Sequence, residues 1–453
     1  MTRMFGTDGV RGIANADLTC ELAFRIGQAG AKLLTNEAHR PRILIARDSR
    51  ISGDMLRFAI TAGIASVGAD AVDIGILPTP GAAYLVRAYE ADAAVVISAS
   101  HNSFEYNGIK WFNGEGFKLS DEIEDQIEAM VGGDALKNLP TGDEIGSSIR
   151  AHNALNEYVE YLASKSRVDC SGLKVVLDCA NGAASIAAPK VFQQLGAEVY
   201  AYSYTPDGVN INAGCGSTHP GRLRKMVVEQ GADVGFAFDG DADRLISVDE
   251  FGVLIDGDIM LSICGVDMKM RNELKKNTIV GTVMTNLGMM RSMQSQGIDV
   301  VCTDVGDRYV LERMRSDGFN LGGEQSGHLI FFDHSTTGDG ILSAIQILNI
   351  MAARKEQLST LAKVCEIYPQ ILINVEISPQ NKSSWREDEV VQKKIAEVET
   401  RMAERGRVLV RASGTEPLLR VMLEGQDEQL INEEALEIAR VMVERFEGHI
   451  RNK

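Results

Sequence analysis

KVVLDCANGAAS, residues 174–185, opens a unit that decides the fold: an apolar strand, a polar loop with asparagine and glycine, and an apolar-periodic helix. The same plan begins with RILIARDSRISG at residues 42–53 and with TIVGTVMTNLG at residues 278–288. A turn then leads from each helix into a second strand, and the glycines of these turns are Gly68, Gly196 and Gly297. Left-handed glycines end helices, and strands that alternate with helices predict parallel or mixed sheets. We therefore predict three similar α/β domains in tandem.

The pattern changes near residue 370. From there the sequence predicts a strand, a long charged helix (390–404), two strands that turn at SGTEP (413–417), and a final helix (427–447). This order indicates a smaller α+β domain. The predicted fold class is therefore α/β, with three tandem α/β domains of mixed sheets and a C-terminal α+β domain. The predicted domain boundaries are residues 1–150, 151–255, 256–367 and 368–453.

Length and charge limit the classes of function. The chain has 453 residues, which at about 150 residues per domain predicts about three domains. Its 63 acidic residues outnumber its 46 basic residues and give a net charge of −17. A partner of nucleic acid or of an anionic membrane needs a cationic surface, so we expect neither to be bound.

No targeting or redox signal stands out. The first residues, MTRMFGTDGVRG, contain no apolar secretory signal, and the run ILSAIQILNIMAA (341–353) is too short to span a bilayer and is predicted to be a buried helix. The seven cysteines form no CxxC pair, which favours reduced thiols in the cytoplasm over a disulfide framework or a zinc site. The absence of Walker A, HExxH, GxSxG and GxGxxG motifs weakens several common enzyme classes.

A polar loop follows the apolar start of VVISASHNSFEYNGIKWF (residues 95–112). Its polar residues are Ser98, Ser100, His101, Asn102 and Ser103. Ligands of α/β sheets collect at the carboxyl ends of strands, where such a serine hydroxyl would be presented. The alternative is a polar turn whose side chains bond to their own backbone.

Three carboxylates alternate in FAFDGDADRLISVDE (residues 236–250). Asp239, Asp241 and Asp243 can converge on one point, where they repel strongly unless a cation lies between them. Hard oxygen ligands suit Mg²⁺, Mn²⁺ or Ca²⁺. Arg244 adds a cation that could face a phosphate. The sequence therefore favours a divalent-metal site over a solvated acidic turn.

An EF-hand is the competing interpretation of this segment. Counted from Asp239, Glu250 stands at position 12, as in an EF-hand loop. Position 6, however, is Arg244, where the sharp turn of that loop needs glycine. The flanking segments also have the pattern of strands and not of helices, which argues against this motif.

Two further loops could bind a ligand. In LGGEQSGHLIF (321–331), Glu324, Ser326 and His328 alternate, and on an extended segment they would point one way toward sugar hydroxyls or an amine. The alternative is an ordinary strand edge after a glycine turn. RASGTEPLLRVM (411–422) has the composition of a phosphate cradle, although a plain hairpin with flanking arginines is equally compatible. The cradle residues are Arg411, Ser413, Gly414, Thr415 and Arg420.

The ordered set of motifs is more specific than any single loop. FGTDGVRG (5–12), SASHN (98–102), DGDADR (239–244), GEQSGH (323–328) and RASGTEP (411–417) together resemble the α-D-phosphohexomutase superfamily, over nearly the whole chain. Within it, VNINAGCGSTHP (209–220), TTGDGI (336–341) and RASGTEP are similar to the bacterial branch that acts on glucosamine phosphates. The branches that act on mannose or glucose phosphates usually differ there.

This resemblance implies four domains around a central cleft, each of which contributes one loop. It implies the interconversion of glucosamine 6-phosphate and glucosamine 1-phosphate through a phosphoserine enzyme and a 1,6-bisphosphate, on the route to UDP-N-acetylglucosamine. It also implies one Mg²⁺ per subunit, glucosamine or glucose 1,6-bisphosphate as activator, and a monomer or homodimer in the cytoplasm. The alternatives are a mannose or glucose phosphate mutase, a simple phosphatase and a non-catalytic Ca²⁺-binding protein.

The resemblance also implies roles for individual residues. Ser100 would be the phosphorylated nucleophile, and a phosphoserine oxygen would join Asp239, Asp241 and Asp243 around Mg²⁺. Glu324 and Ser326 would bind sugar hydroxyls. The non-reacting phosphate would be held by Arg411, Ser413, Gly414, Thr415 and Arg420. Candidates for proton transfer or charge stabilisation are Arg11, His101, Lys110, Arg244 and His328; Lys110 would act as a base only if neighbouring cations lowered its pKa. One departure is Ser103, where the family usually has proline, which predicts a looser loop after the nucleophile.

Overall fold

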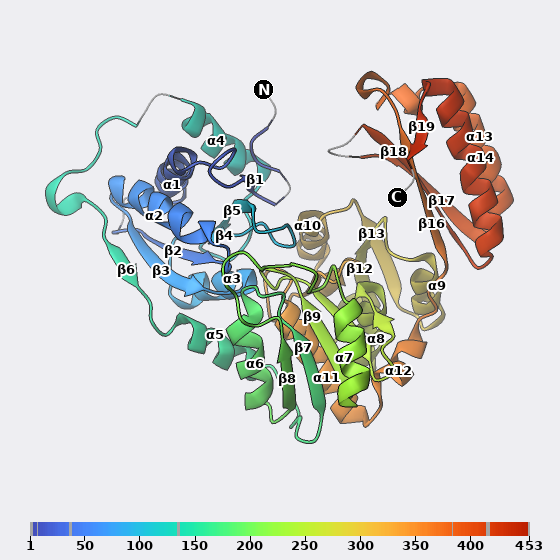
Figure 1. The fold of residues 1–453 in the computed structure, drawn as a ribbon, viewed down its shortest axis with the longest axis horizontal. Helices are drawn as coiled ribbons and strands as arrows, with labels where there is room; N and C mark the ends of the chain where they lie inside the picture. Colours follow the sequence, from blue (N-terminus) through green and yellow to red (C-terminus); the bar gives the residue numbers. More distant parts are fainter. Residues whose placement is uncertain are drawn as a thin grey trace. The chain divides into compact units, whose positions relative to one another are not determined.

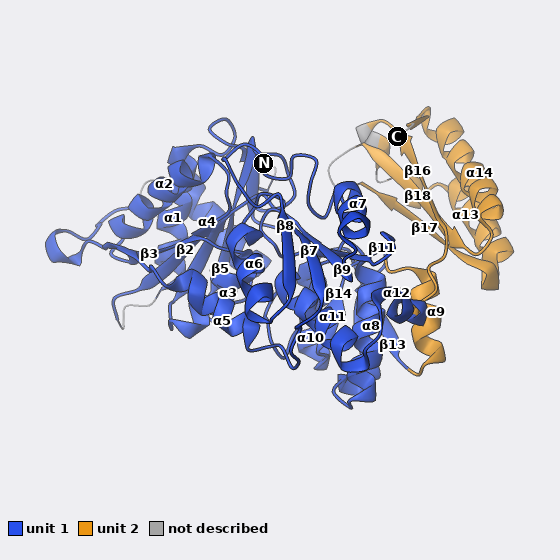
Figure 2. Cartoon of the chain, turned by 60° about the horizontal axis from the view of Figure 1, so that its bottom comes forward, with its two compact units in different colours: residues 1–284, 298–364 blue, residues 285–297, 365–453 orange. Residues whose placement is uncertain are grey.

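The computed structural model describes residues 3–6, 8–35, 39–133, 136–382, 384–413 and 417–451. Its strands form four sheets (Figure 1). The chain divides into two compact units (Figure 2), of which one contains residues 1–284 and 298–364 and the other contains residues 285–297 and 365–453. The first three sheets belong to the larger unit and the fourth belongs to the smaller unit.

The first sheet is mixed. In order across the sheet, its strands are β1 (Val10–Ile13), β5 (Tyr106–Asn113), β4 (Ala93–Ile97), β2 (Arg42–Arg47), β3 (Asp70–Ile76) and β6 (Ser148–Arg150). The pairs among β4, β2, β3 and β6 are parallel, whereas β5 is antiparallel to both of its neighbours. A common apolar core joins α1 (Cys20–Leu34), α2 (Ser52–Ser66) and α4 (Asp121–Gly132) to one face, and α3 (Thr79–Ala88) packs against β2 and β4.

The second sheet contains the hairpin on which the acidic motif lies. Its strands, in order, are β11 (Leu254–Ile255), β10 (Leu245–Asp249), β9 (Val234–Phe238), β7 (Lys174–Asp178) and β8 (Glu198–Tyr202). β7 is parallel to β8 and β9, whereas β9 and β10 are antiparallel. The helices of this region are α5 (Ala154–Ala163), α6 (Ala184–Gln194) and α7 (Gly221–Gln230).

The third sheet is built in the same way. Its strands, in order, are β13 (Asp299–Thr303), β12 (Thr278–Thr282), β14 (Leu321–Gly323) and β15 (Leu329–Phe331). Its helices are α8 (Gly257–Met270), α10 (Asp307–Asp317), α11 (Gly340–Arg354) and α12 (Leu358–Leu361). Helix α11 is buried from Gly340 to Met351, which confirms the predicted buried helix. Among the described residues, no helix is both long and apolar enough to cross a membrane.

The smaller unit has an antiparallel sheet covered by helices. The strands, in order, are β17 (Gly406–Ala412), β18 (Leu418–Gly425), β16 (Gln370–Glu376) and β19 (His449–Arg451), and the helices are α13 (Glu389–Met402), α14 (Glu428–Phe446) and α9 (Leu287–Ser295). The fully buried Glu424 of β18 ties α9 to this sheet. It accepts hydrogen bonds from the Leu287 amide at 3.2 Å and from Gln370 Nε2 at 3.0 Å, and pairs with Arg407 at 2.6 Å.

The predicted fold class is confirmed. In each of the three repeats the two strands pair in parallel, as the alternation of strands and helices predicted. The turn glycines Gly68, Gly196 and Gly297 have φ of +90°, +88° and +68°, the left-handed conformation that ends a helix. All seven cysteines lie in the described part of the chain, and none of them forms a disulfide there. The predicted domain boundaries stay a prediction, because the compact units divide the chain differently and take α9 out of the third repeat.

Helices α1 and α2 approach closely at glycines. A Cβ atom on Gly63 would lie 2.2 Å from the Phe24 carbonyl oxygen, and one on Gly27 would lie 2.7 Å from that of Ile60. Both contacts are with backbone, which cannot rotate away as a flexible side chain can. The packing that covers the first sheet therefore depends on these glycines.

We expect Gly63→Ala to destabilise the larger unit by about 1–3 kcal/mol, the usual effect of overpacking a well-filled core. The matched control is Gly132→Ala, because a Cβ there meets nothing within 4 Å and alanine favours the helix by about 0.5–1 kcal/mol. Urea unfolding followed by circular dichroism measures both. Equal midpoints for the two variants would contradict the close approach of α1 and α2.

Candidate active site

The Ser100 hydroxyl is buried at the carboxyl end of β4. Its side chain is 1% exposed, and its Oγ donates a hydrogen bond to Asp239 Oδ2 at 2.7 Å and lies 3.2 Å from His101 Nδ1. The predicted nucleophile and the predicted metal loop are therefore in direct contact, although 139 residues separate them in the sequence. The site thus joins the first and second sheets.

The Ser100 backbone is in an unusual conformation. Its φ is +51°, a left-handed value that costs a residue other than glycine about 1–3 kcal/mol and persists only where surrounding contacts impose it. Here the Ser100 amide donates to Ser98 Oγ at 3.0 Å, and Ser98 Oγ donates to Asp48 Oδ2 at 2.6 Å. The Ser100 carbonyl accepts from Arg50 Nη2 and Asn212 Nδ2, both at 2.9 Å. Residues outside the predicted set therefore hold the nucleophile.

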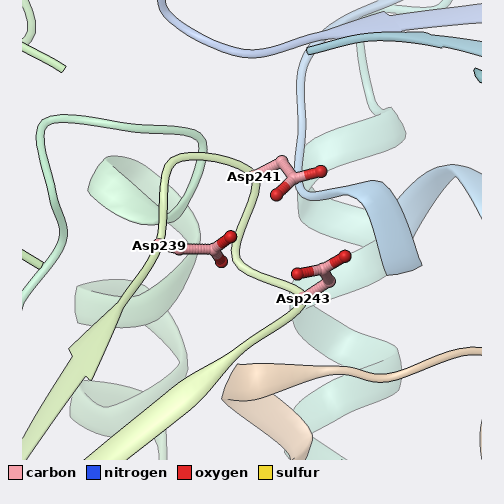
Figure 3. Close-up of side chains that lie close together, drawn as sticks. All are labelled: Asp239, Asp241 and Asp243. Atoms are coloured by element: carbon pink, nitrogen blue, oxygen red, sulfur yellow. The ribbon is translucent and has the colours of Figure 1, made fainter. Parts of the chain in front are cut away.

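Three carboxylates converge on the loop between β9 and β10. One oxygen from each of Asp239, Asp241 and Asp243 lies within 4.8 Å of the others, and all three side chains are buried (Figure 3). Among the described residues, Asp241 Oδ1 and Asp243 Oδ1 find no hydrogen-bond donor. Converging carboxylates with spare oxygens can hold a hard divalent cation. The predicted strands on both sides of this loop are confirmed, and they exclude an EF-hand, whose calcium loop lies between helices.

Repulsion between these carboxylates changes the pKa of Asp239. Burial, followed by the charges of Asp243 and Asp241, raises the pKa of Asp239 well above its usual range. Burial also acts to raise the pKa of Asp243, but the hydrogen bond and charge of His328 outweigh it and lower that pKa. In the absence of a cation, Asp239 therefore binds a proton more readily than Asp243.

Lys110 lies on β5 and points into the acidic cluster. Its Nζ is 2.8 Å from Asp241 Oδ2 and 3.0 Å from Asp8 Oδ2, and the side chain is 2% exposed. Burial acts to lower the pKa of Lys110, but the charges of Asp241 and Asp8 outweigh it, so the pKa is raised. Lys110 therefore does not meet the condition for a base, which required cations as its neighbours.

Asp8 connects the cations of the site. It pairs with Arg11 and Lys110, and its Oδ1 is 2.7 Å from Lys118 Nζ. Lys118 in turn pairs with Asp307 at the start of α10, at 2.5 Å, and so links the first and third sheets. The sequence prediction missed Asp8, Lys118 and Asp307. Asp8 lies within FGTDGVRG, so that motif carried its signal, whereas Lys118 and Asp307 lie in none of the motifs quoted above.

Arg244 and His101 lie beside the contact between Ser100 and Asp239. The Arg244 amide donates to Asp239 Oδ1 at 3.2 Å, and its Nη1 is 3.4 Å from His101 Nδ1. Burial, with added repulsion from Arg244 and Arg11, lowers the pKa of His101 to about 4. His101 is therefore a neutral imidazole near pH 7, and its Nδ1 lies within reach of both Ser100 Oγ and Arg244 Nη1.

The segment with Glu324, Ser326 and His328 is a turn between β14 and β15, so the prediction of an extended segment that points all three one way is wrong. His328 is buried, accepts a hydrogen bond from the Gly338 amide at Nε2 (3.0 Å) and has Nδ1 3.7 Å from Asp243 Oδ2. Glu324 Oε1 accepts from the Gly306 amide at 3.1 Å, whereas Ser326 is exposed. His328 thus joins the acidic cluster, and the other two do not accompany it.

The predicted phosphate cradle lies in the smaller unit. Arg411 of β17 and Arg420 of β18 are directly opposite each other in the antiparallel register. Burial, followed by the charge of Arg420, lowers the pKa of Arg411. Like charges in this arrangement repel, and an anion between them relieves the repulsion. Ser413 is buried beside them, while Gly414 and Thr415 lie outside the described residues.

Comparison with known proteins gives a consistent result along the whole chain. The family described as phosphoglucomutase/phosphomannomutase matches it with each of its four domains. Alpha/beta/alpha domain I matches residues 2–137, domain II matches 156–252, domain III matches 256–368, and the C-terminal domain matches 372–441.

Relatives of high identity share one description. The chain is 53% identical over 448 residues to a phosphoglucosamine mutase of Acetivibrio thermocellus, covering 98% of this chain and all of that protein. It is 50% identical over 447 residues to the phosphoglucosamine mutase of Clostridioides difficile, with 98% and 100% coverage.

Solved structures share the fold at lower identity. A phosphoglucomutase/phosphomannomutase family protein of Burkholderia thailandensis aligns with a TM-score of 0.82 at 24% identity, over 99% of both chains. The N-acetylphosphoglucosamine mutase of Aspergillus fumigatus, solved with GlcNAc-6P and magnesium, aligns with a TM-score of 0.71 at 17% identity, over 98% of this chain and 96% of that one.

Divalent-cation binding is expected to strengthen as pH rises. Because the pKa of Asp239 is raised, this carboxyl must lose a proton when the cation binds, so affinity falls as pH is lowered through that pKa. Calorimetric titration with MgCl₂ near pH 6 and near pH 8, in two buffers of different ionisation enthalpy, measures both the affinity and the released proton.

Asp239→Asn is expected to weaken cation binding at least about tenfold and to abolish the proton release. The matched control is Asp249→Asn, since Asp249 is also buried but its side chain accepts hydrogen bonds from the turn amides of Phe251 and Val253. Undiminished affinity in Asp239→Asn would remove this residue from the cation site.

Proposed function

The chain belongs to the phosphoglucomutase/phosphomannomutase family, and on that premise we propose that Ser100 is its phosphoryl carrier. At about 50% identity to phosphoglucosamine mutases along nearly its full length, it is a phosphohexomutase of the isomerase class that interconverts glucosamine 6-phosphate and glucosamine 1-phosphate. One observation carries the role of Ser100: its buried hydroxyl donates to a carboxylate of the acidic cluster at 2.7 Å.

The acidic cluster fits a magnesium ion. We propose that Asp239, Asp241 and Asp243 hold one Mg²⁺ per chain, together with a phosphoserine oxygen on Ser100. The fit rests on three buried carboxylates that converge and on two oxygens that find no donor among the described residues. A bound Mg²⁺ supplies positive charge that stabilises the developing alkoxide of Ser100 as the phosphoryl group departs.

The proton transfers follow from the protonation states of the neighbours. The Ser100 hydroxyl must lose its proton when the phosphoryl group returns to it, and His101, neutral and 3.2 Å away, can accept that proton. Despite its burial, the charges of Asp241 and Asp8 raise the pKa of Lys110, so Lys110 is proposed to stabilise negative charge or to donate a proton. Arg11 and Arg244 are proposed to stabilise the charge spread over the transferring phosphoryl group. His328, in contact with Asp243, is a further candidate for proton transfer.

The substrate is proposed to be held at its two ends by different loops. Glu324 and Ser326 are assigned to the sugar hydroxyls or amine. The non-reacting phosphate is assigned to Arg411, Ser413, Gly414, Thr415 and Arg420, which the opposed arginines of the hairpin support. Phosphoserine gives its phosphoryl group to the free sugar hydroxyl, and the resulting 1,6-bisphosphate turns round and returns the other phosphoryl group to Ser100. Added glucosamine or glucose 1,6-bisphosphate would therefore activate enzyme that lacks the phosphoserine.

Ser100→Ala is expected to reduce turnover of glucosamine 6-phosphate by at least about 10⁴-fold, because the covalent phosphoryl carrier is lost. A coupled assay with Mg²⁺ and catalytic glucose 1,6-bisphosphate measures this loss, and intact-mass analysis shows whether the added phosphate of the parent protein is missing. Ser262→Ala, which removes a buried hydroxyl of α8 bonded to the Asp258 carbonyl, is the control. Faster turnover of glucose or mannose phosphate by the parent protein would favour a sister mutase.

Arg420→Ala is expected to raise KM and lower kcat together, each by about tenfold or more, because one arginine of the phosphate grip is lost in every bound state. Arg445→Ala, which removes an exposed guanidinium paired with Asp388 in the same unit, serves as the control. Unchanged kinetics for Arg420→Ala would reject the assignment.

A further inference from the structure

We propose that Arg50 and Asn212 form a clamp that holds the backbone of the nucleophile loop, residues 100–103, and aims the Ser100 hydroxyl at the acidic cluster. The inference rests on the proposed role of Ser100 as phosphoryl carrier. Neither side chain is bonded to Ser100 Oγ, so both are positioning residues and not catalytic ones. Neither residue belongs to the set that sequence or resemblance assigned to the site.

Arg50 provides one side of the clamp from the loop after β2. Its side chain is 1% exposed, and Nη2 donates to the carbonyl oxygens of Ser100 and Asn102, each at 2.9 Å. Nη1 donates to the carbonyl of Ser103. Asp48 Oδ2 accepts from Nε at 2.9 Å and fixes the plane of the guanidinium group. One buried cation therefore holds three carbonyls of the nucleophile loop.

Asn212 provides the other side from the second α/β region. Its Nδ2 donates to the same two carbonyl oxygens, those of Ser100 and Asn102, again at 2.9 Å each. Asn212 itself is fixed, since its amide donates to the Ala180 carbonyl at 2.9 Å. Asn212 lies in VNINAGCGSTHP (209–220), a segment similar to that of enzymes that act on glucosamine phosphates. The similarity did not assign a role to this residue. Its side-chain amide is bonded to the nucleophile loop.

The clamp holds the carbonyl of Ser100, and other contacts hold its amide. The Ser100 amide donates to Ser98 Oγ, which donates to Asp48, and Asp48 is the ion-pair partner of Arg50. The carbonyl of Ser100 is thus bonded directly to Arg50, and its amide is linked to Arg50 through Ser98 and Asp48. Holding both groups fixes the two backbone dihedrals of Ser100 and explains how its φ of +51° is kept.

The clamp also sets the nucleophile against the metal loop. A Cβ on Gly240, next to Asp239, would lie 2.5 Å from the Ser100 carbonyl oxygen and 2.9 Å from Asn212 Nδ2. The backbone of the acidic loop therefore packs tightly against the Ser100 carbonyl and the Asn212 side-chain amide. A shift of the clamp would therefore move Ser100 Oγ relative to Asp239.

The kinetic test compares Arg50→Lys, which keeps the charge but loses the forked donors, with Asn212→Ala. We expect kcat to fall by about 100-fold and about 10-fold respectively, since an error of about 1 Å in aim has effects of this size, and KM to change by less than about threefold. The double variant is expected to lie within about threefold of Arg50→Lys, because both residues hold the same carbonyls. Asn349→Ala, which removes a buried amide bonded to the Lys165 carbonyl, is the stability control.

If Arg50 and Asn212 only stabilised the fold, their variants would have a lower melting temperature but would not show a fall in kcat at nearly unchanged KM. This is the result expected for Asn349→Ala. The clamp is contradicted if both single variants keep kcat within twofold of the parent protein, if KM rises as much as kcat falls, or if the double variant shows the full product of the two losses.

Hydrogen exchange gives a readout that does not need the reaction. In peptides covering residues 98–106, amide exchange should be at least about tenfold faster in Arg50→Lys and Asn212→Ala than in the parent, and unchanged in Asn349→Ala. Unchanged exchange in the first two variants would overturn the clamp. If exchange responds as expected but the parent protein converts no hexosamine phosphate, the clamp is supported and the proposed function fails.

Discussion

The crowding of negative charge at the end of the β9–β10 hairpin is the constraint on which the larger unit depends. Three buried carboxylates within 4.8 Å of one another would separate or bind protons unless positive charge surrounds them. The surrounding groups come from distant parts of the chain: Lys110 from the first sheet, Arg244 from the second and His328 from the third. Three separate sheets are thus held together where the chemistry is proposed to occur. A divalent cation at this cluster, as proposed, would relieve the repulsion.

The repeated units could be predicted because their signals are local. An apolar run followed by a loop, a periodic helix and a left-handed glycine is read from neighbouring residues, and the three parallel strand pairs follow from it. The acidic loop was found for the same reason, since its three carboxylates stand within five residues. The helix of residues 341–353 was predicted to be buried because this run is strongly apolar but too short to span a bilayer, and α11 is buried.

The parts that were missed depend on contacts between distant residues. Arg50 and Asn212 are 162 positions apart, and only the assembled fold shows that they hold the same two carbonyls. Asp8 became visible as the hub of three cations for the same reason. The alternation of Glu324, Ser326 and His328 was misinterpreted because Gly327, with φ of +93°, turns the chain there. Ser103 was predicted to loosen the loop because it replaces the usual proline. Its carbonyl, however, accepts a hydrogen bond from Arg50, and this contact restrains the backbone at that position.

The helix of the third repeat has a consequence for how this protein can be taken apart. Because α9 packs with the C-terminal sheet and the buried Glu424 accepts the amide of Leu287, the chain passes between the two units three times, near residues 284, 297 and 364. A fragment cut near residue 368 would lack a helix that belongs to its own fold. Conversely, a larger unit made without the C-terminal residues would still contain α9, between the paired strands β12 and β13, without the sheet against which α9 packs. The C-terminal region is therefore not an exchangeable module, and insertions, fusions or recombination with related proteins must transfer residues 285–297 with it.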